Sequence, residues 1–154
     1  MKTIAFIINF RPEKWLGGFN YIYSLIFFLK KFKIKDFKIL IITNDRKYFK
    51  KPHDIPGVKI IETNLVSKRS TFQNILRRLE IFLFGKNKKL EKFLLRNKVY
   101  ATSHFEFTGK KSKIKSFTWF PDFQEINLPG FFNLKTKFLR LFKLAGAYKH
   151  STKL

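Results

Sequence analysis

Three continuous apolar runs, rich in β-branched and aromatic residues, limit what this chain can fold into. They cover residues 3–10 (TIAFIINF), 38–44 (KILIITN) and 58–66 (VKIIETNLV). Apolar residues follow one another in these runs instead of alternating with polar ones, so both faces of each strand are expected to be covered. Strands of this kind are typical of parallel sheets that carry helices on both sides.

Helical patterns separate these runs along the whole chain. The predicted helices cover residues 20–32, 71–84, 87–97 and 134–148, and two further strands are expected at 99–105 and 114–120. The helix at 71–84 has one apolar stripe, made of Phe72, Ile75, Leu76, Leu79, Phe82 and Leu83. The last helix has another, made of Leu134, Phe138, Leu141, Phe142, Ala145 and Tyr148. Alternation of strands and helices predicts a doubly wound, mostly parallel α/β sheet forming one domain over residues 1–154.

The strong positive charge leaves several kinds of partner open. The chain has 33 Lys plus Arg against 10 acidic residues, a net charge of +23. Such a charge suits nucleic acid, anionic lipid or an anionic substrate. It also follows from A/T-rich coding, because Phe (21 residues), Lys, Ile and Asn are abundant together. The basic residues are spread evenly, which argues against a specific nucleic-acid partner.

The N-terminal half shows no sign of export or of a membrane span. The first apolar run contains Asn9, and the Arg11-Pro12-Glu13 segment that follows lacks a small-residue cleavage site. The longest uncharged stretch, residues 15–29, is shorter than the roughly 20 residues that span a bilayer. No cysteine is present, which excludes disulfides, thiolate catalysis and cysteine-based zinc sites. We therefore expect a cytoplasmic protein.

Two segments at strand ends are the candidates for chemistry, because ligands of open parallel sheets bind beyond the carboxyl ends of the strands. The first contains Gly17 and Gly18 with Asn20, between the first strand and the first helix. Paired glycines let a ligand approach the backbone, and free N–H groups at a helix start favour an anion. The alternative is a plain strand-to-helix turn, which is glycine's commonest use.

The second segment, residues 119–129, follows the fifth predicted strand. It contains the carboxylates of Asp122 and Glu125 and the carboxamide of Gln124. These groups can accept hydrogen bonds from sugar hydroxyls, or they can cap the turn after Pro121. His104, at the end of the fourth predicted strand, is a further candidate for the same edge. No histidine spacing typical of a metal site is present, so we expect no metal.

The WFPDFQ sequence at residues 119–124, followed by Leu128-Pro129 and Phe131-Phe132, resembles a segment of group 1 (family 4-like) glycosyltransferases. The resemblance implies a Rossmann-like domain that is the N-terminal, acceptor-binding half of a GT-B fold. A second, C-terminal domain would bind the nucleotide-sugar donor, and the sugar would be moved with retention of configuration and without an obligatory metal. We expect no cofactor in the present domain. Glu125 stands where that family usually has histidine, so the role of that histidine is not transferred.

The resemblance also suggests partners and site residues. The acceptor would be a cell-envelope polysaccharide or a lipid-linked sugar, held by Gly17, Gly18, Asn20, Gln124 and His104, with Asp122 and Glu125 as catalytic carboxylates. We expect a basic and aromatic surface to meet an anionic membrane on the inner face of the cell; it comprises Trp15, Phe19, Phe131 and Phe132 with nearby lysines. A single domain would hold only one wall of the active site, so we expect no sugar transfer by these 154 residues alone. The alternative from another class is a basic α/β nucleic-acid-binding module.

Overall fold

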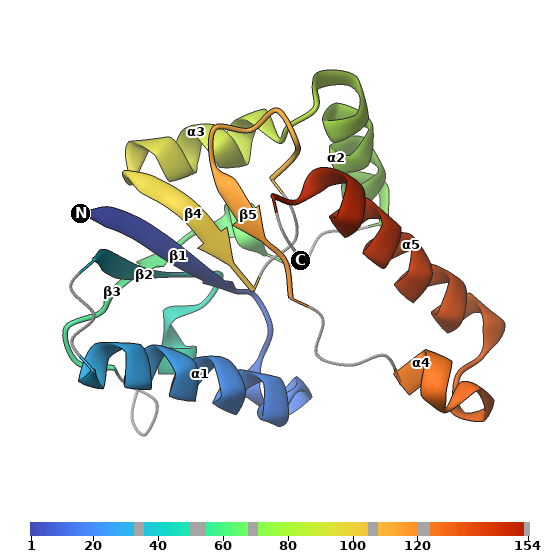
Figure 1. The fold of residues 1–154 in the computed structure, drawn as a ribbon, viewed down its shortest axis with the longest axis horizontal. Helices are drawn as coiled ribbons and strands as arrows, with labels where there is room; N and C mark the ends of the chain where they lie inside the picture. The colour runs from blue at the N-terminus through green and yellow to red at the C-terminus, as the bar shows by residue number, and fades with distance from the viewer. Residues whose placement is uncertain (33–35, 50–54, 68–70, 105–107, 120–123, 153–154) are drawn as a thin grey trace.

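A computed structural model describes residues 1–32, 36–49, 55–67, 71–104, 108–119 and 124–152 (Figure 1). The strands are β1 (Lys2–Ile8), β2 (Phe37–Thr43), β3 (Lys59–Glu62), β4 (Val99–Ser103) and β5 (Lys115–Phe117). The helices are α1 (Leu16–Lys31), α2 (Thr71–Phe84), α3 (Lys88–Arg96), α4 (Gln124–Asn127) and α5 (Leu134–His150). Short 3₁₀ turns lie at Pro12–Lys14, Arg46–Phe49, Asn64–Val66 and Pro129–Phe131.

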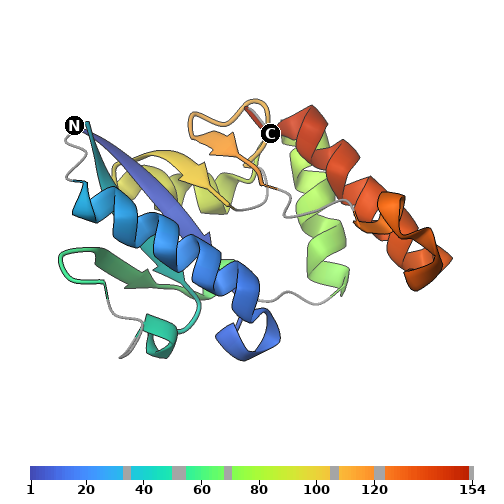
Figure 2. The same ribbon diagram turned by 60° about the horizontal axis from the view of Figure 1, so that its bottom comes forward.

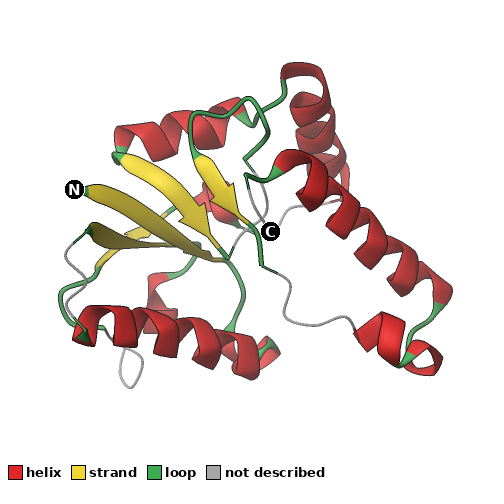
Figure 3. Cartoon of the chain, in the orientation of Figure 1, coloured by secondary structure: helices red, strands yellow, loops and turns green. Residues whose placement is uncertain are grey.

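All five strands form one parallel sheet in the order β3-β2-β1-β4-β5 (Figure 3). The central strand β1 pairs with β2 on one side, where Ile4 faces Ile39, and with β4 on the other, where Ile4 faces Ala101. The α/β class and the parallel sheet predicted from the apolar runs are therefore confirmed. Successive strands are added first on the β2 side of β1 and then on the β4 side, which is the doubly wound arrangement.

Alternate residues of β1 supply two separate cores, one on each face of the sheet. Phe6 and Ile8 pack with Phe19, Ile22 and Ile26 of α1. On the opposite face the neighbouring side chains of β1 form the second core. That core contains Ala5, Ile7, Leu40, Ile42, Leu90, Leu94, Val99 and Ile114. Figure 1 shows α1 and α3 on opposite sides of the sheet, and this double coverage explains why the strand sequences read as unbroken apolar runs.

Helix α1 begins four residues earlier than the predicted helix at 20–32. The 3₁₀ turn at Pro12–Lys14 brings the chain round quickly, and Trp15 then occupies the N-cap position. Gly17 and Gly18 are consequently part of the first helical turn and not of a loop before it. Phe19 is completely buried against the sheet, so its assignment to a membrane-facing surface was wrong.

Two strands, β3 and β5, have half or less of the length predicted for them. The run at 58–66 forms a strand only up to Glu62, because Thr63 then caps a 3₁₀ turn by accepting a hydrogen bond from the backbone N–H of Leu65 (3.3 Å). The last strand is limited to Lys115–Phe117. Its outer edge is partly covered by residues that follow α5, since the Thr152 N–H donates to the carbonyl of Ser116 (2.9 Å).

Helices α2 and α5 lie side by side beyond β5, away from the face that α1 covers (Figures 1 and 2). Their apolar stripes point outward. In α2 the residues Leu76, Leu79, Phe82 and Leu83 are exposed, while Arg77 and Ile81 are buried. In α5 Ala147 is the buried residue, and the stripe from Leu134 to Tyr148 is exposed. The predicted stripes therefore exist as helix faces, but they do not contribute to the two cores.

Candidate functional site

The carboxyl ends of β1 and β4 mark the point where the direction of strand addition reverses. In open α/β sheets this reversal leaves a crevice in which ligands bind, because the loops from the two neighbouring strands lead away in opposite directions. Here the loop after β1 leads into the start of α1, and β4 ends directly before His104. The candidate site is built from these two ends and from the end of β5.

Aromatic side chains from four parts of the chain meet at this point, and we call Phe10, Trp15, Tyr21, His104 and Trp119 the ring cluster. Tyr21 of α1 stacks almost parallel on Trp119 beyond β5, with ring centroids 4.8 Å apart and planes at 7°. The ring centroid of His104 lies 5.1 Å from that of Trp119 and 5.7 Å from that of Tyr21. The ring centroid of Trp15 lies 5.9 Å from that of Trp119 and 5.0 Å from that of Phe10. The cluster thus joins the loop after β1, the start of α1 and the ends of β4 and β5.

Part of the ring cluster is open to solvent. Trp15 is 39% exposed and Tyr21 is 46% exposed, although both take part in ring contacts. Large aromatic faces that combine packing with exposure provide an apolar platform for a ligand, and their polar edges can orient it.

His104 has the most unusual backbone in the cluster, with a φ of +60°. This left-handed conformation is uncommon for residues other than glycine and is often found where function requires it. Its N–H donates to the carbonyl of Phe117 (3.2 Å), and its Nδ1 lies 2.7 Å from the hydroxyl oxygen of Ser103. The imidazole also stacks on Phe6, with centroids 5.6 Å apart. Four side chains therefore surround the imidazole, namely those of Phe6, Tyr21, Ser103 and Trp119.

The half-buried His104 has one ring nitrogen without a partner among the described residues. The Nε2 atom is buried and has no hydrogen bond among the described residues. Because burial disfavours the charged ring, it lowers the pKa of His104 below the ordinary value of 6.5. A neutral imidazole bonded through Nδ1 can offer Nε2 as a donor or an acceptor, depending on its tautomer.

Two further buried polar atoms without a hydrogen bond in the described part of the chain lie in or directly after a strand of the sheet. They are Oδ1 of Asn44, which directly follows β2, and Oγ1 of Thr102 in β4. Buried polar groups are normally paired, so such atoms indicate where water or a ligand completes the structure. Neither residue was predicted from the sequence. A polar residue directly after an apolar strand was the only available signal, and it is a weak one.

The two glycines of the first segment have different surroundings. A Cβ at Gly18 would lie 2.4 Å from the indole of Trp15, whereas a Cβ at Gly17 would meet nothing within 4 Å. Gly18 is therefore required by the Trp15 ring, which occupies the space that was expected to admit a ligand. Gly17 and Asn20 are exposed. The N-cap residue Trp15 provides no side-chain hydrogen bond to the first turn of α1, so the first N–H groups of the helix receive no side-chain cap.

The second predicted segment is only partly placed. Asp122 lies outside the described residues. Gln124 and Glu125 open the short helix α4, and the structure describes their backbone but not their side chains. Trp119, the first residue of this segment, lies in the ring cluster together with His104. The contributions of Asp122, Gln124 and Glu125 to a site stay predictions.

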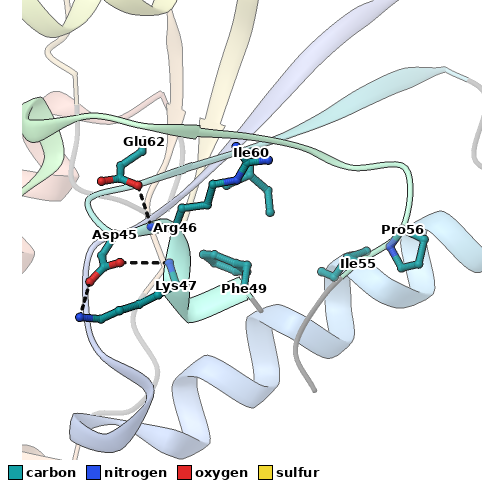
Figure 4. Close-up of a pocket in the computed structure, with 8 residues that line it drawn as sticks. All are labelled: Asp45, Arg46, Lys47, Phe49, Ile55, Pro56, Ile60 and Glu62. Atoms are coloured by element: carbon teal, nitrogen blue, oxygen red, sulfur yellow. Dashed lines mark hydrogen bonds and ion pairs between the residues drawn. The ribbon is translucent and has the colours of Figure 1, made fainter. Parts of the chain in front are cut away.

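An open pocket of about 560 Å³ lies near the ends of β2 and β3 (Figure 4). Both of its carboxylates are already paired. Lys47 lies 2.9 Å from Asp45, and the backbone N–H of Arg46 donates to the carboxylate of Glu62 (3.0 Å). The hydrogen bond and charge of Lys47 lower the pKa of Asp45. A pocket whose carboxylates are satisfied from within offers less to a polar ligand than the unpaired Nε2 atom of His104.

Within the described ranges, no group of His, Asp and Glu side chains is arranged to hold a metal ion. None of the helices in the part of the chain that the structure covers has the length and apolarity needed to cross a membrane. The chain matches no protein-family model, no curated protein and no solved structure.

Proposed function

We propose that this chain is the acceptor-binding domain of a retaining glycosyltransferase and that the ring cluster receives the acceptor sugar. The observation that carries this proposal is the position of the cluster at the carboxyl ends of β1 and β4. A sugar ring has faces of C–H groups that pack on aromatic planes and edges of hydroxyl groups that need hydrogen-bond partners. Trp15 and Tyr21 offer exposed aromatic surface of this kind.

His104 supplies the polar part of the proposed site. Its Nε2 atom is buried and has no hydrogen bond among the described residues, so it is the atom that an acceptor hydroxyl group would pair with on binding. A neutral imidazole can then hydrogen-bond the acceptor hydroxyl without placing a second charge in an already basic protein.

The similarity of residues 119–132 to group 1 glycosyltransferases supports the same assignment from the sequence. In this proposal the nucleotide-sugar binds a second domain, and the present domain positions the acceptor hydroxyl against the donor. Glu125 stands at the position where that family usually has histidine, so the proposal assigns Glu125 no proton transfer.

Calorimetric titration with octyl β-glucoside below its micelle concentration tests the proposal. We expect saturable binding, and Tyr21→Ala should weaken it at least tenfold because Tyr21 touches both Trp119 and His104. Tyr148→Ala is the matched control, since Tyr148 is 81% exposed and lies on α5. An octyl ether with an ethylene-glycol head measures the binding of the alkyl chain alone. Equal binding of both amphiphiles, or equal effects of the two tyrosine substitutions, would contradict the proposal.

A titration with a mixed-sequence DNA duplex over a range of salt concentrations distinguishes the nucleic-acid alternative from the sugar-binding proposal. Binding that disappears at physiological salt reflects net charge alone, because exposed charges are screened there. Tight binding that persists at physiological salt and is insensitive to Tyr21→Ala would favour the alternative.

A further inference from the structure

Helix α5 combines an exposed apolar face with an absence of negative charge. Its 17 residues span about 25 Å at 1.5 Å per residue. Leu134 is 83% exposed, Phe138 is 69% exposed and Tyr148 is 81% exposed, while Leu141 and Phe142 are about half exposed. Apolar residues with this spacing form one face of the helix, and that face is turned to solvent.

The basic residues of α5 accompany this exposed face. They are Lys135, Lys137, Arg140, Lys143 and Lys149. Of these, Lys135, Lys143 and Lys149 are exposed. The sequence contains no Asp or Glu after Glu125, so nothing on α5 neutralises these cations from within the helix. The apolar segment that precedes α5 adds Phe131, which is 85% exposed.

We infer that α5 is a docking helix for an anionic phospholipid surface, with its apolar face toward the acyl chains and its lysines at the phosphate level. An amphipathic helix with large apolar residues on one face and Lys or Arg beside them binds in the plane of a membrane interface. Anionic lipid attracts each basic residue near the surface. The surface assigned to the membrane thus moves from Trp15 and Phe19 to α5.

Charge decides against a second copy of the chain as the occupant. Two copies meeting through α5 would bring two helices without carboxylates together, in a protein of net charge +23. Like charges that face each other oppose association, whereas an anionic surface is complementary. The inference does not depend on the sugar-binding proposal, because α5 contributes no residue to the ring cluster.

Flotation with lipid vesicles tests the charge requirement. We expect the full chain to bind vesicles of phosphatidylcholine with phosphatidylglycerol at low salt, and to bind pure phosphatidylcholine weakly. Lys135→Glu with Lys149→Glu should reduce binding at least about 30-fold, since two basic contacts are lost. Lys89→Glu with Lys92→Glu on α3 is the matched control with the same change in net charge and should retain more than half of the binding. An equal loss in both variants would overturn the inference, because net charge alone would explain it.

Insertion of the apolar face is tested separately. The chain has no cysteine, so Phe138→Cys and Phe28→Cys each provide a single site for an environment-sensitive dye. Phe28 is a matched control because it is 49% exposed and lies on α1. We expect a blue shift of the dye at position 138 on acidic vesicles and no shift at position 28. A shift at position 138 without vesicles that grows with protein concentration would indicate a second copy instead and would overturn the inference, as would no shift at all.

Discussion

Replacing Gly18 by alanine tests whether the first turn of α1 is built around Trp15. The added Cβ would overlap the indole, whose nearest ring atom would be 2.4 Å away. Trp15 is 39% exposed, so the ring can rotate outward and the helix itself can remain intact. The expected consequence is the loss of Trp15 from the ring cluster.

The size of the effect follows from two opposing contributions. Alanine is favoured over glycine in a helix by about 0.5–1 kcal/mol. Against this, Trp15 would lose its ring contacts with Phe10 and Trp119. Each aromatic pair contributes about 0.5–1.5 kcal/mol, so both together contribute about 1–3 kcal/mol. Gly17→Ala is the matched control, because a Cβ at Gly17 meets nothing within 4 Å.

Denaturant unfolding and tryptophan emission measure the outcome. Gly17→Ala should stabilise the fold by up to about 1 kcal/mol, and Gly18→Ala should be about 1–3 kcal/mol less stable than Gly17→Ala. In a Trp119→Phe background, which leaves Trp15 as the one tryptophan, emission should move to longer wavelength with Gly18→Ala alone. Equal stability and equal emission of the two alanine variants would refute the reasoning.

Three further predictions concern buried or half-buried polar side chains. Glu91→Gln should cost about 1–3 kcal/mol, because the buried carboxylate pairs with Lys86 (2.6 Å) and accepts from the backbone N–H of Lys113 (2.7 Å); urea unfolding measures the cost, and a change below 0.5 kcal/mol would be contrary to it. Asn87→Ala should lower the free energy of unfolding by about 1 kcal/mol, since Asn87 caps α3 by accepting a hydrogen bond from the Leu90 N–H (3.0 Å). The helical circular dichroism of the folded protein should change little, because α3 still forms. Burial lowers the pKa of His104 below its unfolded value of about 6.5, so the unfolded chain binds more protons than the folded one below that pH. The contribution of His104 to the free energy of unfolding is therefore fully present above about pH 6.5 and is lost as the pH falls through the folded pKa. His104→Gln should flatten this decline in pH-dependent unfolding, and an unchanged slope would contradict the assignment.

The strands were predictable because burial on both faces leaves a direct mark on the sequence. Each residue of the β1 segment between Ala5 and Ile8 is buried, in one core or the other. The helix boundaries were harder to predict from the sequence. The start of α1 depends on the 3₁₀ turn at Pro12–Lys14 and on the fit of Trp15 over Gly18, which is a contact of side chain with backbone.

The direction of a helical stripe was not predictable from its periodicity. The spacing of Phe138 and Phe142 in α5 shows that an apolar face exists, but not whether the sheet or another partner covers it. The members of the ring cluster were equally hard to predict from the sequence. The strand-end rule indicated His104, whereas Tyr21 lies within a helix and reaches the site through its stacking on Trp119. Contacts between distant segments leave no pattern in a single sequence.

The two tryptophans allow the most direct measurement of the central claim, which is that the ring cluster receives a sugar. Trp15 and Trp119 are the two tryptophans of the chain and both belong to the cluster, so the indole N–H region of a ¹H–¹⁵N spectrum contains signals from this site alone. During titration with octyl β-glucoside, both indole signals should shift together and saturate, and the non-sugar octyl ether should leave them in place. Indole signals that stay fixed while the sugar binds elsewhere, or that move equally with both amphiphiles, would contradict the account.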